Sequence, residues 1–149
     1  FTYQKPTYKD YSATVKFDDG ETADLNATGN IVKEIPQILI ELDPSYTFYK
    51  DKMTVWGSFR YFGKTYANLS NALWFNGHWE TFAGVKWNAT NKLSFNLGVV
   101  NFLNQKGASG TISGSELIGP EEAKRFNGYV MSGRYLRPFT VEFGASVKL

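Results

Sequence analysis

The chain ends on the stretch FTVEFGASVKL, residues 139–149, in which apolar and polar side chains alternate without a break. Successive side chains of a β-strand point to opposite faces, so this stretch predicts a strand with one wholly apolar and one wholly polar face. The apolar members are Phe139, Val141, Phe143, Ala145, Val147 and Leu149. These eleven residues, at about 3.3 Å each and tilted by about 40°, span roughly 27 Å, which is close to the apolar band of an outer-membrane β-barrel.

Five earlier stretches show the same alternation. They cover residues 11–17, 38–48, 53–62, 73–87 and 93–103. The connections between the six predicted strands alternate in length: residues 49–52 and 88–92 are short, whereas residues 18–37, 63–72 and about 104–128 are long. Outer-membrane barrels have tight periplasmic turns and long extracellular loops, so this pattern predicts that Phe1 and Leu149 both lie on the periplasmic side.

The composition narrows the class of function. The net charge of +2 gives no argument for nucleic acid as a partner, and the lack of cysteine excludes thiolate metal sites and disulfides. No run approaches the roughly 18 apolar residues of a transmembrane helix, and no stretch keeps a helical period. The one weak helical candidate, PEEAKRF at 120–126, is equally well interpreted as a polar loop. With one His and no clustered carboxylates, the sequence offers no catalytic set, so we expect neither an enzyme nor a cofactor.

Six strands are too few for a free-standing barrel. Each unpaired backbone group at an open edge costs several kcal/mol in lipid, and single-chain outer-membrane barrels begin at about eight strands. We therefore expect residues 1–149 to form the C-terminal wall of a larger all-β, antiparallel transmembrane barrel whose other strands lie upstream. Two alternatives stay open: a complete small eight-stranded outer-membrane protein, and a soluble, aromatic-rich β-sandwich binding module whose apolar faces point inward.

Four stretches carry a family resemblance: IPQILIELDPSYTF at 35–48, FRYFGKTYANLSNALWFNGHWETFAGVKW at 59–87, LGVVNFLNQKGASGTISGSELI at 97–118 and YVMSGRYLRPFTVEFGASVKL at 129–149. They resemble the C-terminal barrel of TonB-dependent outer-membrane receptors, in particular the Bacteroidetes type. The resemblance implies a wall segment of a plugged barrel of about 22 strands that imports a bulky nutrient: an iron chelate, a glycan, cobalamin or a peptide. The partners it implies are the lipid bilayer, the remaining strands and plug of the same receptor, the TonB complex through segments outside this chain, and, as an option, a surface lipoprotein.

Five side chains on the polar parity of the strands predicted at 53–62 and 73–87 are candidates for substrate contact: Trp56, Trp74, Asn76, His78 and Glu80. An aromatic ring in a lumen can stack on a ligand or pack against a plug, and polar groups can simply line a hydrated wall. His78 has no second His at a metal-ligand spacing, so no metal site is predicted. The acidic loop DDGETAD at 18–24 lacks the spacing of an EF-hand and predicts a solvated hairpin loop.

Two further groups of residues relate to the membrane. Trp87 lies on the apolar parity next to a short turn, and Tyr46 and Phe48 lie near the other short turn, so the three predict an aromatic girdle at the membrane interface. The final segment also resembles a barrel-assembly signal. Its places are filled by Glu142, Gly144, Val147 and Leu149.

Overall fold

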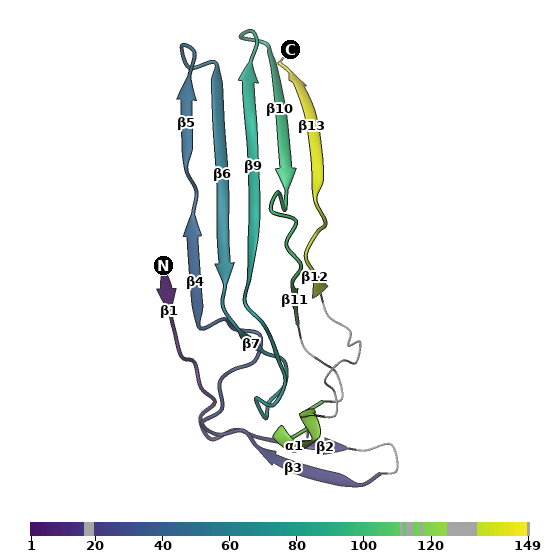
Figure 1. The fold of residues 1–149 in the computed structure, drawn as a ribbon. Helices are drawn as coiled ribbons and strands as arrows, with labels where there is room; N and C mark the ends of the chain where they lie inside the picture. Colours follow the sequence, from purple (N-terminus) through teal and green to yellow (C-terminus); the bar gives the residue numbers. More distant parts are fainter. Residues whose placement is uncertain (17–19, 111, 113–114, 117, 125–133, 149) are drawn as a thin grey trace.

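The computed structural model describes residues 1–16, 20–110, 112, 115–116, 118–124 and 134–148. Its main feature is one antiparallel sheet in the order β1-β4-β6-β9-β10-β13, with β5 also paired to β6. These strands are β1 (Thr2–Tyr3), β4 (Ile38–Leu42), β5 (Ser45–Phe48), β6 (Met53–Phe62), β9 (His78–Asn88), β10 (Leu93–Val100) and β13 (Thr140–Val147). Figure 1 shows the sheet as a tall wall, with the two short turns and the C-terminus at one end and the long connections at the other.

The remaining elements are short and lie in the long connections. They are β2 (Ser12–Lys16) with β3 (Thr22–Asn26), β7 (Thr65–Tyr66) with β8 (Trp74–Phe75), β11 (Ala108–Ser109) with β12 (Arg134–Tyr135), and the single-turn helix α1 (Pro120–Ala123). No helix among the described residues has the length and apolar character that a membrane span requires. Over the described residues the fold is therefore all-β apart from one turn of helix, as predicted.

Five of the six predicted strands form the main sheet; the strand at 53–62 has the predicted ends, and the others have corrected ends. Residues 38–48 form two strands in line, because Pro44 has no N–H to donate to the ladder although its carbonyl accepts from the Gly57 N–H at 2.9 Å. Residues 73–87 also divide: Trp74–Phe75 pair with β7, and the long strand begins at His78. The strand predicted at 93–103 ends at Val100, since Asn101 has a φ of 51° and turns the chain.

The strand predicted at 11–17 is present at Ser12–Lys16, but it lies outside the wall. It pairs with Thr22–Asn26 in a hairpin of its own, in which the Thr14 hydroxyl donates to Asp24 Oδ1 at 2.6 Å. The short β1 occupies the sheet edge instead, beside Leu39 and Ile38. Pairing between strands that are close in sequence costs little loop-closure entropy, which explains a local partner for β2. Of the acidic loop predicted at 18–24, residues 18–19 lie outside the described residues, and residues 22–24 belong to strand β3 and not to a loop.

The register aligns like faces across all the long strands. One row crosses the sheet through residues that face each other on neighbouring strands: Tyr46, Val55, Val85, Leu97 and Phe143. This apolar face is open to the surroundings: Phe139, Val141 and Phe143 are 50%, 56% and 72% exposed. A sandwich would bury them in a core, so the arrangement agrees with a lipid-facing wall and not with the soluble module.

The buried apolar core lies at the long-loop end rather than in the sheet. Ala67, Leu73 and Ile112 form it, with Phe75, Ile118 and Ala123 packed against them. The sheet itself has two incompletely paired edges within the described residues. The register of β13 runs along β10 alone, and β1 covers only two residues of β4. Unpaired edges of this length require further strands when the surroundings are lipid.

Candidate binding face and loop assembly

The polar face of β6 and β9 carries a cluster of charged and aromatic side chains. Arg60 is directly opposite both Glu41 on β4 and Glu80 on β9. Its Nε lies 3.8 Å from Glu41 Oε1, and its guanidinium carbon lies 6.0 Å from the centre of the Phe82 ring. The sequence pattern points to Glu80 but not to Arg60 or Glu41, because only the register reveals that the three share a row.

His78 lies one same-face row further toward the long loops. Its ring stacks on Phe62 at 5.6 Å, and the backbone of Gly107 lies so close that a Cβ there would be 2.9 Å from His78 Cβ. Three buried polar atoms of this face have no hydrogen-bond partner among the described residues: Ser58 Oγ, Arg60 Nε and His78 Nδ1. Buried polar atoms are normally satisfied, so this face is chemically suited to a further polar partner.

Two hollows adjoin these strands. The first, of about 390 Å³, is lined by His78, Glu80 and Phe82 from β9 and by Arg134 and Arg137 near β12 and β13. Arg137 also donates to Glu142 Oε1 at 2.7 Å, which leaves the pocket with mixed charge. Within the described residues, no three His, Asp or Glu side chains gather as metal ligands.

The second hollow, of about 640 Å³, lies beside β8. Trp74 and Asn76 line it together with Asn104, Gln105 and Tyr135, among others. Trp74 is 53% exposed, and the Lys64 ammonium lies 4.0 Å from its ring centre and 4.5 Å from that of Tyr66. Exposed rings, amides and a lysine offer stacking and hydrogen bonding to a polar ligand.

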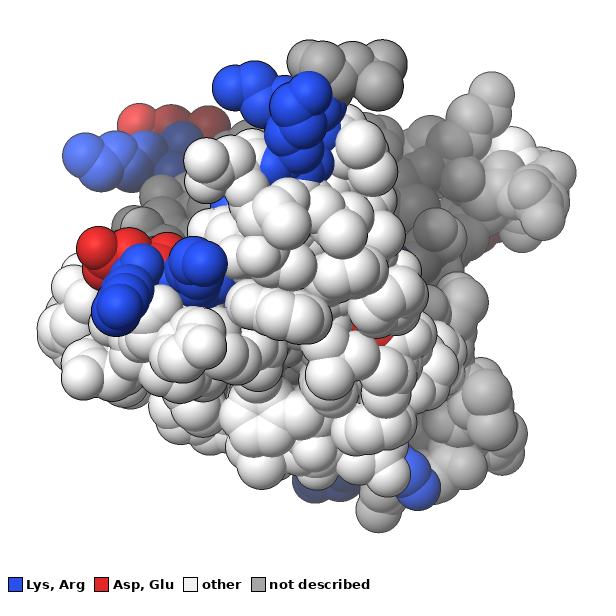
Figure 2. Space-filling view, turned by 90° about the horizontal axis from the view of Figure 1, so that it is seen from above, with Lys and Arg blue, Asp and Glu red and all other residues white. Residues whose placement is uncertain are grey.

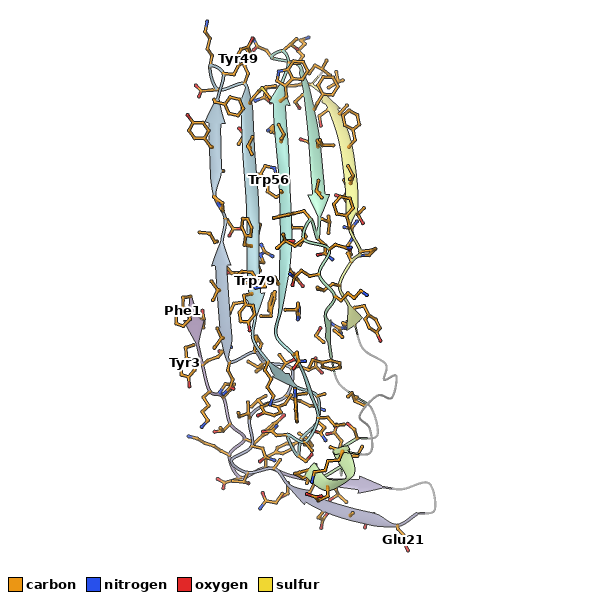
Figure 3. All side chains as sticks on the ribbon, viewed as in Figure 1. Phe1, Tyr3, Glu21, Tyr49, Trp56 and Trp79 are labelled. Atoms are coloured by element: carbon orange, nitrogen blue, oxygen red, sulfur yellow. The ribbon has the colours of Figure 1, made fainter. Side chains whose placement is uncertain are left out.

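Trp56 lies apart from the other four candidates. It sits closer to the short turns than Trp79, which occupies the opposite face of the sheet (Figure 3). Its ring covers Gly84, where an added Cβ would be 2.7 Å from two Trp56 ring carbons. The five candidates therefore separate into three places: Trp56 on the wall, His78 and Glu80 in the smaller hollow, and Trp74 and Asn76 in the larger.

A hydrogen-bonded assembly fixes the long loops next to the hollows. Asn68 is fully buried; its amide donates to Ser115 O at 2.8 Å and Ile118 O at 3.2 Å, and its Oδ1 accepts from Leu73 N at 3.1 Å. Glu116 joins a third loop, accepting from Lys33 Nζ at 2.8 Å and from Leu69 N at 2.9 Å. The structural roles of Asn68 and Glu116 could not be predicted from the sequence, since their neighbours in sequence form no recognisable motif.

The predicted girdle residues come together on the apolar face. Phe48 and Trp87 share a row through Met53, and Tyr46 stacks on Phe48 at 6.0 Å. Phe95 and Phe143, which the prediction omitted, extend the group, with Trp87–Phe95 at 5.6 Å and Phe95–Phe143 at 6.1 Å. Near the long loops, Tyr61 and Trp79 form a second pair at 5.1 Å. Trp87 and Trp79 are eight residues apart, or roughly 27 Å along the strand, so rings bracket both ends of the apolar band.

The assembly-signal residues lie on the open edge strand β13. Glu142 is held by Arg137, and Gly144 faces Asn96, whose Nδ2 is 3.0 Å from where a Cβ would stand. Val147 is 67% exposed opposite Leu93, and Leu149 lies outside the described residues.

No protein-family model and no curated protein matches the chain. Solved structures do. The Pseudomonas aeruginosa receptor FpvA bound to heterologous pyoverdines matches with a TM-score of 0.57 at 21% identity, over 85% of this chain and 16% of its own. The ferripyoverdine receptor of the outer membrane of the same organism matches with a TM-score of 0.51 at 22% identity, over 89% of this chain and 16% of its own. The ferric-catecholate import receptor Fiu from Escherichia coli K12 matches with a TM-score of 0.53 at 15% identity, over 95% of this chain and 19% of its own.

These likenesses define the fold. The wall of β4, β5, β6, β9, β10 and β13 has the arrangement found in part of the β-barrel of outer-membrane receptors. The chain spans less than a fifth of the length of the receptors it matches.

Proposed function

We propose that this chain is part of the barrel of a TonB-dependent receptor that imports a bulky nutrient across the bacterial outer membrane. The observation that carries the proposal is the exposed apolar face, which runs in register across the long strands and is bracketed by aromatic rings. The opposite face is polar, and the long loops gather at one end, as a receptor wall requires. The fold likeness to receptors for ferripyoverdine and ferric catecholate supports the same function.

In this function the loop end lies outside the cell, and the short turns with the C-terminus lie in the periplasm. The remaining strands and a plug complete the barrel, TonB supplies the coupling to inner-membrane energy, and a surface lipoprotein would have to dock at the long-loop end. The chain performs no covalent chemistry. Its part is to hold ligand-contacting side chains on a rigid wall, and Trp74, Asn76, His78 and Glu80 beside the two hollows are the residues we assign to it.

The function is tested by nutrient uptake in cells that carry the full receptor. Trp74→Ala removes an exposed ring and should weaken ligand binding by about 0.5–1.5 kcal/mol, the usual contribution of an aromatic stacking contact, while leaving the receptor at wild-type abundance in the outer membrane. Tyr46→Ala, at the opposite end and on the apolar face, is the matched control and should leave ligand affinity unchanged. Wild-type receptor found outside the outer-membrane fraction would overturn the proposal.

A further inference from the structure

Asn76 and Gly77 form the short link between β8 and β9, and both line the larger hollow of about 640 Å³. Both residues are exposed, and neither belongs to a strand. Within the part of the chain that the structure describes, no hydrogen bond holds the Asn76 side-chain amide or the Gly77 N–H. The amide carbon of Asn76 and the backbone nitrogen that follows it are therefore free to approach each other.

An asparagine followed by a glycine can modify itself. The Gly77 nitrogen, once its proton has passed to water, attacks Asn76 Cγ. The new N–C bond closes a succinimide ring, and the C–N bond of the side-chain amide breaks to release ammonia. Water then opens the ring at either carbonyl, which gives aspartate or isoaspartate. Glycine favours ring closure because it has no Cβ to hinder the attack and its backbone rotates more freely than that of other residues.

Packing requires glycine at position 77. A Cβ there would lie 2.6 Å from the Tyr61 hydroxyl oxygen and 2.9 Å from Phe62 O, at the end of β6. Both distances are too short for a real side chain, so the fold excludes the larger residues that would slow the reaction. The reactive pair is thus a consequence of how closely the β8–β9 link lies against β6.

The surrounding hollow determines what the reaction would change. Among the described side chains that line it, Lys106 alone is charged, whereas the rings of Trp74 and Tyr135 and several side-chain amides are neutral. Aspartate or isoaspartate at position 76 adds a negative charge to this lining, and isoaspartate also lengthens the backbone by one methylene group. The lining changes from basic to neutral in net charge.

We propose that Asn76–Gly77 is a modification site at which the folded protein converts its own amide to aspartate or isoaspartate, and that this reaction alters the charge of the larger hollow with age. Water is the only co-reactant, and no enzyme is needed. The reaction does not depend on the proposed function, because it proceeds on this wall whatever the hollow binds. The other Asn-Gly pair of the sequence, Asn127–Gly128, lies outside the described residues.

The first experiment follows the amide in the full receptor. Purified receptor is kept in heavy-oxygen water at mildly alkaline pH, and peptide mapping by mass spectrometry measures the uptake of the label at each asparagine. Asn76 should take up the label at least about tenfold faster than two exposed control asparagines, which corresponds to a barrier lower by about 1.4 kcal/mol or more. Equal rates at the three positions would overturn the proposal, and so would the absence of label at Asn76.

The two controls separate the effect of the following residue from that of location. Asn104 lines the same hollow and is exposed, but it precedes Gln105. Asn91 is exposed in a short turn at the opposite end of the wall, and it precedes Lys92. Figure 2 looks onto that end and shows several basic side chains around its edge.

The second experiment tests whether the fold leaves the pair reactive. Asn76 should be converted in the folded receptor at a rate within about tenfold of that in the guanidinium-unfolded chain. Asn76→Gln should remove the signal, because glutamine must close a larger ring. Conversion in the unfolded chain alone would refute the proposal, and label that persists in the Asn76→Gln peptide would refute the assignment to Asn76. Nutrient uptake and membrane fractionation report separately on the receptor function.

Discussion

Gly84 shows how a single residue shapes the polar face of the wall. Trp56 lies over it, and a Cβ at Gly84 would be 2.7 Å from the ring and 2.8 Å from Leu97 O. Gly98 is directly opposite Gly84 in the sheet, yet the nearest atom to a Cβ there is Glu142 O at 4.0 Å. Packing therefore requires glycine at position 84 but not at position 98, although the two glycines lie in the same row.

Gly84→Ala in the full receptor should lower the free energy of unfolding by about 1–3 kcal/mol, because the added methyl meets a backbone oxygen and a ring that cannot both yield. Gly98→Ala should change it by about 0.5 kcal/mol or less. Urea unfolding in lipid vesicles, followed by tryptophan fluorescence, measures both. Equal losses for the two variants would show that Trp56 does not lie over Gly84.

Strand β10 has two faces in different surroundings. Leu97 lies in the middle row of the apolar face, between Val85 and Phe143, and is 47% exposed. Asn96 is its neighbour in sequence, but it points to the polar face, between Lys86 and Gly144. In a membrane wall, a charge at position 97 would contact lipid, whereas a charge at position 96 would face water. In a fully solvated sheet, both positions would tolerate charge.

Leu97→Lys should therefore destabilise the folded receptor in vesicles by about 2–4 kcal/mol, the cost of a lysine near the bilayer midplane, and Asn96→Lys by about 1 kcal/mol or less. The fraction that folds, read from unfolding curves in lipid, is the measurement. If the larger loss came from Asn96→Lys, the apolar face would not be the one in contact with lipid.

The described residues leave sheet edges and an apolar face uncovered in water. Its sheet has incompletely paired edges at β13 and at β4 and β5, and exposed rings cover one face, including Tyr46 and Phe143, each 72% exposed. Exposed patches and free edges of this kind associate. The small buried cluster around Ala67, Leu73 and Ile112 stabilises the loop end and leaves the sheet face uncovered.

Residues 1–149 produced alone should accordingly aggregate in detergent-free buffer and become dispersed in detergent. Sedimentation velocity in the two conditions gives the result, and a folded soluble protein of similar size is the control. A monomeric species with a cooperative unfolding transition in plain buffer would contradict the interpretation as a barrel wall and favour the soluble β-sandwich binding module.

The local pattern of the sequence was enough to predict five strands of the wall, their two faces and the two short turns. Residues 139–149 and 93–100 are clear because a strand has a period of two, and lipid on one side preserves that period over its whole length. The grouping of Tyr46, Phe48 and Trp87 also followed, since each lies near the end of a strand joined by a short turn.

Which residues are in contact depends on how the strands and loops pack. The hairpin of Ser12–Lys16 with Thr22–Asn26, the position of Arg60 between Glu41 and Glu80, and the burial of Asn68 all depend on partners that are distant or ambiguous in sequence. The same holds for the separation of Trp56 from Trp74 and His78. A side chain's face follows from its own strand, but its neighbours follow from register and loop packing, which are properties of the assembled sheet.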